Sequence, residues 1–534
     1  MRLVRRLCLA GVLPLLLAAA AAGGTVLILP FENQTRNASL EWIGESLVEA
    51  LSDRFTGPQT YVVTREERAA AFDALGIPPA GILSRATILK LAETADADCV
   101  IIGQFTLEPA TNQLRASADV LEMHPPKLAG RAEAAAPLPE LLNIQDRVAE
   151  ALAGQLPGIT LSPAPPRVRL DAWENYIRGL SASSRPQQIK YFREAVRLEP
   201  GLSRAALQLG KIYFQSRDYA TAILWLSKLK HDESNYLEAN FLLGICYFRR
   251  EDYDKAETAL QAVAARLPLN EVYNNLGAAQ SRLNRRAALD NFRKAADADP
   301  ADADYQFNVG YWYYRNGQYA SAARRLRLVL AGRPNDAEAR AVLLKSLERA
   351  GNTADAARER ELLSRNPAGL RFTNLDDRAL EGLERIKRNY DEPSFRQLQL
   401  TLQTLDEEKL SRLPRTQHAQ VHLERGRDLF REQNDAEALN ELKEAATLDP
   451  QASDTHLLLA RLYERGGQKE EAIREAELAL AAPKPVDAHL LLAKVYLEQN
   501  KLQEAQRHAQ QVLSMEPGNV AARSVLQTIQ MRSP

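Results

Sequence analysis

The chain has 534 residues, and its 68 Lys and Arg residues nearly balance its 69 Asp and Glu residues, so the formal net charge is −1. This balance argues against a strongly basic nucleic-acid-binding protein, because such proteins obtain their non-specific affinity from excess Lys and Arg. Hydrophobic residues make up 45% and charged residues 26% of the chain, which is ordinary for a globular protein and predicts that most of it is folded.

Residues 1–22 have the three parts of a secretory signal. Three arginines lie within the first six residues, an apolar run follows over residues 7–19, and alanines occupy residues 20–22. We therefore expect an exported protein from which this segment is cleaved. The alternative is an uncleaved membrane anchor, but the run is rich in alanine and short of the roughly 20 residues that span a bilayer. No later segment is a candidate for a transmembrane helix.

Residues 23–160 switch repeatedly between strand and helix patterns. Apolar runs and alternating residues predict four strands, at residues 25–30, 61–64, 98–105 and 113–123. Apolar residues at helical spacing predict three helices, at residues 39–55, 87–95 and 138–156. The order of these elements predicts a small α/β domain with a mixed sheet. Cys99 in this domain and Cys246 further on have apolar neighbours, which predict two buried free thiols.

Three segments of this domain, residues 26–33, 40–47 and 97–103, resemble the TolB-like amino-terminal domain of bacterial envelope and regulatory proteins. The resemblance implies an α/β domain that is often joined to helical repeats, and it does not imply an enzyme active site. With the signal pattern, it leads us to expect a protein of the periplasm or cell envelope of a Gram-negative-type bacterium. Neither GxGxxG nor the phosphate-binding GxxxxGKS/T motif occurs, and Gly23 and Gly24 precede the first strand rather than following it. We therefore expect no bound cofactor.

Beyond a proline-rich linker at residues 161–170, the chain is self-similar with a period of 33 or 34 residues. Small residues recur at this spacing, followed at fixed offsets by aromatic residues, an alanine and a helix-ending proline. The recurring small residues are Gly210, Gly244, Gly277, Gly310, Gly426, Ala460 and Ala493. The pattern resembles tetratricopeptide repeats. This resemblance implies paired helices in a superhelix, with a concave surface that holds a peptide or a partner protein.

The repeats fall into two arrays, with an unusual connector between them. The first array covers residues 171–367, the second covers residues 417–518, and a capping helix and tail follow at residues 519–534. The connector, residues 368–416, lacks the repeat markers but keeps helical spacing, so we expect two atypical helices that bridge the arrays. The apolar positions are Ala379, Leu383, Ile386 and Tyr390 for the first, and Phe395, Leu398, Leu402 and Leu405 for the second. The alternative is a hinge between the arrays.

No constellation of catalytic residues is recognisable, because the chain has no GxSxG nucleophile elbow and its acids lie on amphipathic helices. His422, His456 and His489 recur four residues before the small residue of successive repeats. We therefore expect them to form a row, or file, with one histidine on the first helix of each repeat. Adjacent helices are about 8–10 Å apart, too far for all three to bind one metal ion at about 2 Å. We expect packing histidines, no metal site and no enzyme.

By the tetratricopeptide resemblance, the concave groove is lined by residues three before and one and four after the small residue. Carried over to this chain, the partner-binding groove consists of Phe241, Ile245, Phe248, Phe307, Tyr311 and Tyr314. The alternative is that some of these side chains pack against neighbouring helices. A variant of the family binds the terminal carboxylate of a peptide with cations at related positions. Here Asn275 matches, but Asp304 and Asn308 stand where cations are needed, so we expect no such clamp.

An arginine also recurs near the end of the first helix of most repeats, where it complements the helix dipole. These arginines are candidate contacts for an acidic partner, and they are Arg249, Arg282, Arg315, Arg349, Arg431 and Arg465. Together the patterns predict a non-enzymatic scaffold that binds a protein or peptide and no nucleic acid. The alternative is a ligand-responsive regulatory or sensory subunit, in which the amino-terminal domain binds a small molecule and controls the repeats. The patterns leave the oligomeric state open.

Overall fold

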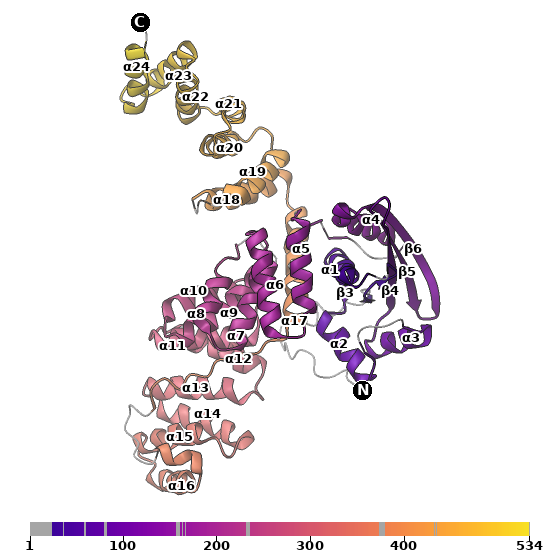
Figure 1. Ribbon diagram of the computed structural model, residues 1–534. Coiled ribbons are helices and arrows are strands. Elements are labelled where there is room, and N and C mark those ends of the chain that lie inside the picture. Colours follow the sequence, from indigo (N-terminus) through magenta and orange to yellow (C-terminus); the bar gives the residue numbers. More distant parts are fainter. Residues whose placement is uncertain are drawn as a thin grey trace. The chain divides into compact units, whose positions relative to one another are not determined.

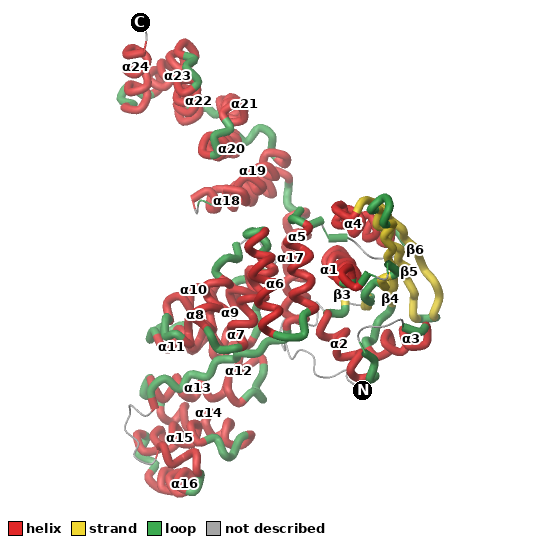
Figure 2. The backbone as a smooth tube through the Cα atoms, in the orientation of Figure 1, coloured by secondary structure: helices red, strands yellow, loops and turns green. Residues whose placement is uncertain are grey.

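The computed structural model describes residues 24–35, 37–57, 60–78, 83–155, 161–162, 164–165, 167–230, 235–372, 380–431, 433 and 435–532. The expected secretory signal, residues 1–22, lies outside them. The chain forms two compact units, which meet in sequence between Leu402 and Gln403. The first unit contains an α/β domain and an array of helix pairs, and the second contains further helix pairs (Figure 1, Figure 2). The predicted fold class, a small α/β domain followed by a helical repeat superhelix, is confirmed.

The α/β domain is built on a mixed sheet with the strand order β3-β1-β4-β5-β6. Its strands are β1 (Thr25–Ile28), β2 (Glu32–Asn33), β3 (Tyr61–Val62), β4 (Cys99–Glu108), β5 (Gln113–Met123) and β6 (Pro126–Pro137). Strand β1 pairs in parallel with β3 and β4, whereas β4, β5 and β6 form an antiparallel meander. Strand β2 pairs with β4 outside this order. The four predicted strands are therefore present.

Strand β6 was not predicted from the sequence. Its buried residues Ala132, Ala134 and Ala136 alternate with the exposed Arg131 and Glu133. Alanine has a low strand propensity, so no β-branched or aromatic run marks this segment. The small side chains form part of the core beneath α4 (Leu141–Ala153). Packing against that helix, rather than intrinsic propensity, determines the strand.

Helices cover both faces of the sheet. Val26 and Ile28 of β1 join the core beneath α1 (Trp42–Phe55) and α4, whereas Leu27 between them joins the core beneath α2 (Arg65–Ala74) and α3 (Arg85–Thr94). Because successive side chains of a strand point to opposite faces, a strand covered on both sides is a continuous apolar run. Helix α2 was not predicted, although Thr64 and Glu67 form a capping box at its start.

The α/β domain is joined to the first helix pair through α1. Ser46 of α1 accepts hydrogen bonds from Gln145 Nε2 at 2.6 Å and from Trp173 Nε1 at 2.7 Å. One turn further along, Glu49 accepts a hydrogen bond from the Tyr176 hydroxyl at 2.9 Å. Trp173 and Tyr176 also belong to the hydrophobic core that extends beneath α1. The domain and the first repeats therefore share one continuous core within the first unit.

The described part of the first array contains six antiparallel helix pairs. The pairs are α5 (Leu170–Ser181) with α6 (Arg185–Leu198), α7 (Ser203–Gln215) with α8 (Tyr219–Leu226), α9 (Tyr236–Arg249) with α10 (Tyr253–Ala264), α11 (Asn270–Arg282) with α12 (Ala288–Ala298), α13 (Ala303–Arg315) with α14 (Tyr319–Gly332), and α15 (Ala337–Arg349) with α16 (Thr353–Ser364). The recurring glycine allows the two helices of a pair to approach closely, since a Cβ at Gly210 would lie 2.4 Å from Leu226 Cδ2. Free Cys99 and Cys246 are both buried, as predicted.

The connector differs from the prediction. The short 3-10 helix η4 (Pro367–Phe372) follows the first array, and residues 383–391 form neither helix nor strand. The predicted helix with Leu383, Ile386 and Tyr390 on one face is therefore wrong, and Ala379 lies outside the described residues. The second predicted helix is present as α17 (Glu392–Ser411), and its residues Phe395, Leu398 and Leu402 pack on the first unit.

The second unit repeats the helix-pair pattern. Its pairs are α18 (Arg415–Arg431) with α19 (Asp435–Leu448), α20 (Ser453–Arg465) with α21 (Lys469–Leu478), which the 3-10 helix η6 (Ala479–Ala481) extends, and α22 (Val486–Glu498) with α23 (Leu502–Met515). Helix α24 (Val520–Arg532) follows where a capping helix was predicted, and Val525 and Ile529 bury its apolar face. Within the described ranges, none of the helices has the length and apolar character to cross a membrane.

Candidate functional site

Residues 380–391, which we call the strap, lie against the first helices of successive pairs in the first array. Two asparagines at equivalent repeat positions each bind both main-chain polar groups of one strap residue. Asn308 Oδ1 accepts from the main-chain N–H of Arg385 at 2.8 Å, and its Nδ2 donates to the carbonyl of Arg385 at 2.7 Å. Asn275 makes the same pair of bonds to Lys387, both at 2.7 Å. These bonds replace the intrahelical bonds that a helix would have formed here.

A third asparagine links these two bidentate contacts. Asn274 donates to the carbonyl of Arg385 at 2.8 Å, and its own Oδ1 accepts from Asn308 Nδ2 at 2.7 Å. Asn274, Asn275 and Asn308 are each at most 1% exposed. A buried amide that lacks a partner costs about 1–3 kcal/mol, and the strap backbone supplies partners to these buried amides.

Glu384 places a fully buried carboxylate among groups of α11 and α13. Its Oε1 accepts from the Ser281 hydroxyl at 2.8 Å and from Arg315 Nη1 at 2.9 Å, and its Oε2 lies 3.5 Å from Arg282 Nη1. The side chain of Glu384 has no exposed surface. The Arg282 guanidinium is held in turn by the Tyr253 hydroxyl at 2.5 Å. Two members of the predicted arginine row therefore bind an acid of the same chain.

The two basic residues that follow in the strap, Arg385 and Lys387, bind carboxylates of the array. Arg385 binds both oxygens of Asp336, at 2.8 and 2.7 Å, and its guanidinium lies 3.7 Å above the centre of the Phe307 ring. Lys387 Nζ binds Asp302 at 2.7 Å and Asp304 at 2.8 Å. Burial by itself raises the pKa of Asp304 and of Asp336, but hydrogen bonds from Lys387 and Arg385 outweigh it, so both pKa values are lowered.

Both ends of the strap are also held. At its start, the Tyr311 hydroxyl donates to the carbonyl of Leu380 at 2.6 Å. Towards its end, Arg388 donates to the carbonyl of Phe214 at 2.6 Å, at the carboxyl end of α7. The Tyr390 hydroxyl donates to Glu238, and its ring lies 5.1 Å from that of Phe241. The strap thus contacts first helices from α7 to α15.

The six predicted groove residues occupy three kinds of position. Phe241, Phe307 and Tyr311 are buried and contact strap residues, as given above. Ile245 is buried in the core of the first unit, whereas Phe248 and Tyr314 are half-buried at its edge. Their contact with an outside partner remains a prediction. Sequence reasoning noted Asn275 and Asn308 but did not select Asn274. The available signal was its position three residues before Gly277, which corresponds to that of Phe241 and Phe307 in their repeats.

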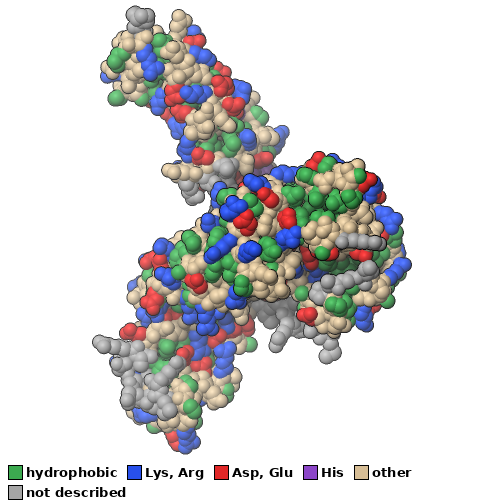
Figure 3. Space-filling model, in the orientation of Figure 1, with side chains coloured by type: hydrophobic (Ala, Val, Ile, Leu, Met, Phe, Trp, Pro, Cys, Tyr) green, Lys and Arg blue, Asp and Glu red, His purple; other side chains and the backbone are tan. Residues whose placement is uncertain are grey.

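The remaining predicted arginines are at the surface or pair locally. Arg431 lies 3.0 Å from Asp428, and Arg465 lies 2.6 Å from Asp435. Arg249 and Arg349 are exposed. Figure 3 shows Lys and Arg side chains interspersed with acids over the visible face of the array, so the helices present no continuous basic surface in this view. Binding of an acidic partner by the arginine row remains a prediction.

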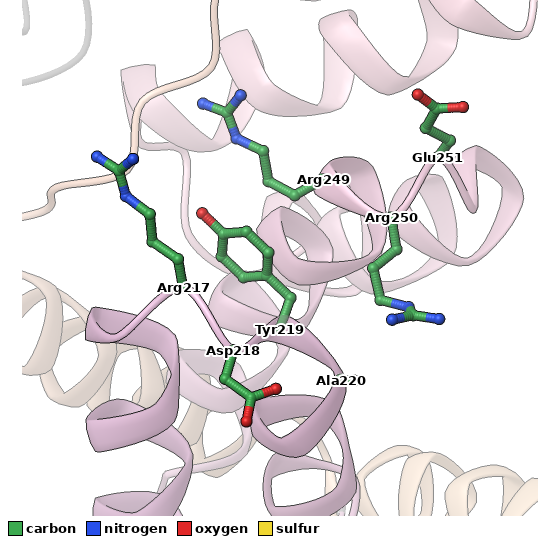
Figure 4. Close-up of a pocket in the computed structure, with 7 residues that line it drawn as sticks. All are labelled: Arg217, Asp218, Tyr219, Ala220, Arg249, Arg250 and Glu251. Atoms are coloured by element: carbon green, nitrogen blue, oxygen red, sulfur yellow. The ribbon is translucent and has the colours of Figure 1, made fainter.

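An open surface pocket of about 500 Å³ lies at the ends of α7 and α9. It is lined by residues 217–220 and 249–251. In Figure 4 the guanidinium groups of Arg217 and Arg249 lie on either side of the Tyr219 hydroxyl, whereas Arg250 and Glu251 point in other directions. The pocket is thus a shallow polar depression between two helix ends and lies outside the strap contacts described above.

The histidine file of the second unit consists of hydrogen-bonded pairs between the helices of a repeat. His422 and His456 contact Glu441 and Glu475 respectively, each through Nδ1 at 2.7 Å. In the last pair His489 Nδ1 lies 2.9 Å from His508 Nδ1. No group of three or more potential metal ligands is found within the described part of the chain. The contacts agree with a packing role for these side chains.

The lowered pKa of His508 predicts that the second unit loses stability in acid. Burial, reinforced by the neighbouring His489 and Arg507, lowers the pKa of His508 from 6.5 to about 4. The unfolded chain therefore binds a proton at a higher pH than the folded chain, so stability decreases as the pH falls from about 6.5 to about 4. We expect hydrogen-exchange protection of α22 and α23, corrected for intrinsic rates, to fall in this range.

The His508→Gln variant is the matched control, because it keeps a polar side chain at this position but does not titrate. An NMR titration of the His508 ring in the wild-type chain should give a pKa near 4. A ring that titrates near 6.5, or a variant with the same loss of protection, would contradict the prediction.

Parts of both arrays match known families. Residues 187–263 match the family model described as anaphase-promoting complex, cyclosome, subunit 3, and residues 429–495 and 486–519 match models described as tetratricopeptide repeat. No match is found among curated proteins.

Similar solved structures each cover about a third of this chain. A structure of MamA is 21% identical, with a TM-score of 0.27, over 28% of this chain and 88% of that chain. MamA from Desulfovibrio magneticus RS-1 is 22% identical, with a TM-score of 0.30, over 32% of this chain and 99% of that chain. YrrB, described as a TPR protein with an unusual peptide-binding site, is 17% identical, with a TM-score of 0.30, over 35% of this chain and 95% of that chain.

Proposed function

We propose that this chain, a tetratricopeptide-repeat protein, is a non-enzymatic interaction scaffold whose first array binds an extended polypeptide. The observation that carries the proposal is the pair of bidentate contacts from Asn308 to Arg385 and from Asn275 to Lys387. An amide that accepts from an N–H and donates to a C=O of one residue recognises the polypeptide backbone itself. Such recognition gives affinity for an extended segment, while the side chains determine which segment binds.

The spacing of these contacts fits an extended ligand. Asn275 and Asn308 lie on the first helices of successive pairs, and they bind strap residues two apart in the sequence. Successive residues of an extended chain point in opposite directions, so every second residue offers the same face. Two neighbouring repeats of the array therefore present one asparagine each to residues two apart in a bound segment.

The test uses the full-length chain with Arg385→Ala and Lys387→Ala, which we call the strap-weakened chain. These changes remove the ion pairs of Arg385 and Lys387 and so weaken the docking of the strap, and they change no residue of the array. A fluorescently labelled peptide with the sequence of residues 380–391 should bind this chain, as measured by fluorescence anisotropy. Adding Asn275→Ala and Asn308→Ala should weaken binding at least about tenfold, because each buried bidentate contact contributes about 1 kcal/mol or more.

Asn316→Ala is the matched control, since Asn316 is an exposed asparagine at the end of α13 that bonds only its own helix among the contacts described. It should leave the affinity unchanged. If a folded strap-weakened chain binds no peptide, the proposed function is wrong.

The proposal also includes a location and a role for the α/β domain. The signal pattern of residues 1–22 supports export to the periplasm or cell envelope, and the TolB-like resemblance supports a role of the domain in contacting an envelope component. Localisation of a tagged chain by cell fractionation tests export: a chain found in the cytoplasm would contradict it. The alternative, in which the domain binds a small regulatory ligand, stays a prediction.

A further inference from the structure

The charges of the strap occur in an order that matches the array beneath them. The acid Glu384 lies within reach of Arg282 and Arg315 at the carboxyl ends of α11 and α13. The bases that follow, Arg385 and Lys387, contact carboxylates at or near the amino ends of α13 and α15. The first-helix face thus has a cationic zone and an anionic zone, and the strap meets them with an acid and then two bases.

The anionic zone requires a cationic occupant. Asp302, Asp304, Asp336 and Glu338 contribute four carboxylates whose side chains are 20%, 23%, 11% and 30% exposed. Within the described residues the array itself places Arg333 on Asp304, at 2.6 Å. The strap adds Arg385 and Lys387, so three cations meet the four carboxylates of the zone. Without a basic occupant, Asp302 and Asp336 would lose the cations that contact them, which is costly for a partly buried carboxylate.

The contacts that hold the strap are of a kind that a separate peptide can replace. Its central residues 384–388 bind mainly through hydrogen bonds and ion pairs. Buried ion pairs contribute little net stability, since desolvation offsets the attraction, but they discriminate strongly against a wrong charge. Because the strap belongs to the same chain as the array, its binding is intramolecular, so a separate peptide competes against a high effective concentration of the strap.

We infer that the first array selects an extended partner peptide with the charge order acid-base-any-base, as in residues 384–387, and that such a peptide binds by displacing the strap. The inference rests on the proposed function, because it names the partner class of the same peptide-binding face. The partner is a separate polypeptide, and the strap acts as its intramolecular competitor.

The experiment compares two labelled peptides on the wild-type and strap-weakened full-length chains. One peptide has the sequence of residues 380–391, and the other has the same sequence with Arg385→Glu and Lys387→Glu. The first peptide should bind the strap-weakened chain at least about tenfold more tightly than the wild-type chain. The reversed peptide should bind the strap-weakened chain about 100-fold more weakly than the first peptide, because it places like charges together.

A charge exchange tests the zone directly. Adding Asp304→Lys to the strap-weakened chain should weaken binding of the first peptide and improve binding of a peptide with the single change Lys387→Glu. Asp355→Lys is the control, because Asp355 lies in α16 and pairs with Arg327 away from the strap. If the double strap variant does not fold, Lys387→Ala alone replaces it.

The outcomes separate the two proposals. Equal binding of both peptides to the strap-weakened chain would overturn the charge selection while leaving peptide binding intact. Equal binding of the first peptide to both chains would overturn displacement. Failure of every peptide to bind a folded strap-weakened chain would instead overturn the proposed function. A wild-type dimer formed by exchanged straps, seen by sedimentation and lost in the strap-weakened chain, would assign the face to a second copy and overturn the inference of a separate partner.

Discussion

Replacing Arg282 and Arg315 together with Ala is expected to release the strap from the first array. Both cations contact the Glu384 carboxylate, which has no exposed surface. Breaking a buried ion pair by removing its cations costs about 3–5 kcal/mol, because the remaining charge is buried without compensation. Release of the strap returns Glu384 to water and avoids this cost. The array itself should remain folded, since Arg282 and Arg315 are 25% and 32% exposed and lie at helix ends.

Hydrogen exchange of the strap amides measures this release. The main-chain N–H groups of Arg385 and Lys387 are held by Asn308 and Asn275 in the docked strap. In the double variant they should exchange about 100-fold faster or more, since each 1.4 kcal/mol corresponds to a factor of ten. Mass spectrometry of the peptide that spans residues 383–391 reports the rates.

Two further variants test whether the uncompensated charge of Glu384 is what releases the strap. Adding Glu384→Gln to the double variant should restore much of the protection, because a neutral amide of the same size needs no cation. Arg249→Ala is the matched control, since Arg249 occupies the equivalent position two repeats before Arg315 and is exposed. It should not change the exchange rates. Unchanged protection in the double variant would show that the ion pairs do not hold the strap.

Phe307→Ala is expected to lower the free energy of unfolding of the first unit by about 3–5 kcal/mol, the usual cost of truncating a buried phenylalanine. The Phe307 ring is fully buried, stacks on Tyr311 at a centroid distance of 5.8 Å and supports the Arg385 guanidinium from below. Its removal leaves a cavity and also withdraws the cation–π contact. Part of the loss should therefore disappear in a chain that already carries Arg385→Ala.

Urea unfolding followed by tryptophan fluorescence measures this change in the first unit. All four tryptophans, Trp42, Trp173, Trp225 and Trp312, lie before Leu402, so the signal does not report on the second unit. Tyr314→Ala, at a half-buried position on the same helix, should cost less than half as much. Equal costs for the two variants would contradict the distinction between a core position and an edge position.

The predicted groove shows how far repeat spacing locates function. Spacing identified the first helices correctly, and three of the residues it selected, Phe241, Phe307 and Tyr311, contact the strap. It did not predict that these side chains are buried beneath a segment of the same chain. Burial depends on what covers a face, and the covering segment lies about 70 to 150 residues away in the sequence.

In the connector, local spacing predicted a helix that the tertiary structure does not contain. Leu383, Ile386 and Tyr390 have helical spacing, but the intervening Glu384, Arg385 and Lys387 each find a partner on the array. A helix would have satisfied the backbone of this segment internally and left the asparagines of α11 and α13 without these bonds. Tertiary hydrogen bonds and ion pairs therefore outweigh a local periodicity of only a few residues. Strand β6 was missed for a related reason, since its alanine-rich sequence carries a weak strand signal and its packing against α4 determines the strand.

The sequence by itself determined the features that repeat or that follow local periodicity. The 33- or 34-residue spacing of small residues specified the helix pairs. At each of these recurring positions, such as Gly210, only a small side chain lets the two helices of a pair pack closely. The apolar runs of β1 and β4 specified a sheet covered on both faces. Only the tertiary structure determined what occupies the first-helix face. The strap is held there by Asn275, Asn308 and a complementary order of charges, and these contacts join residues distant in sequence, whose proximity no local pattern encodes.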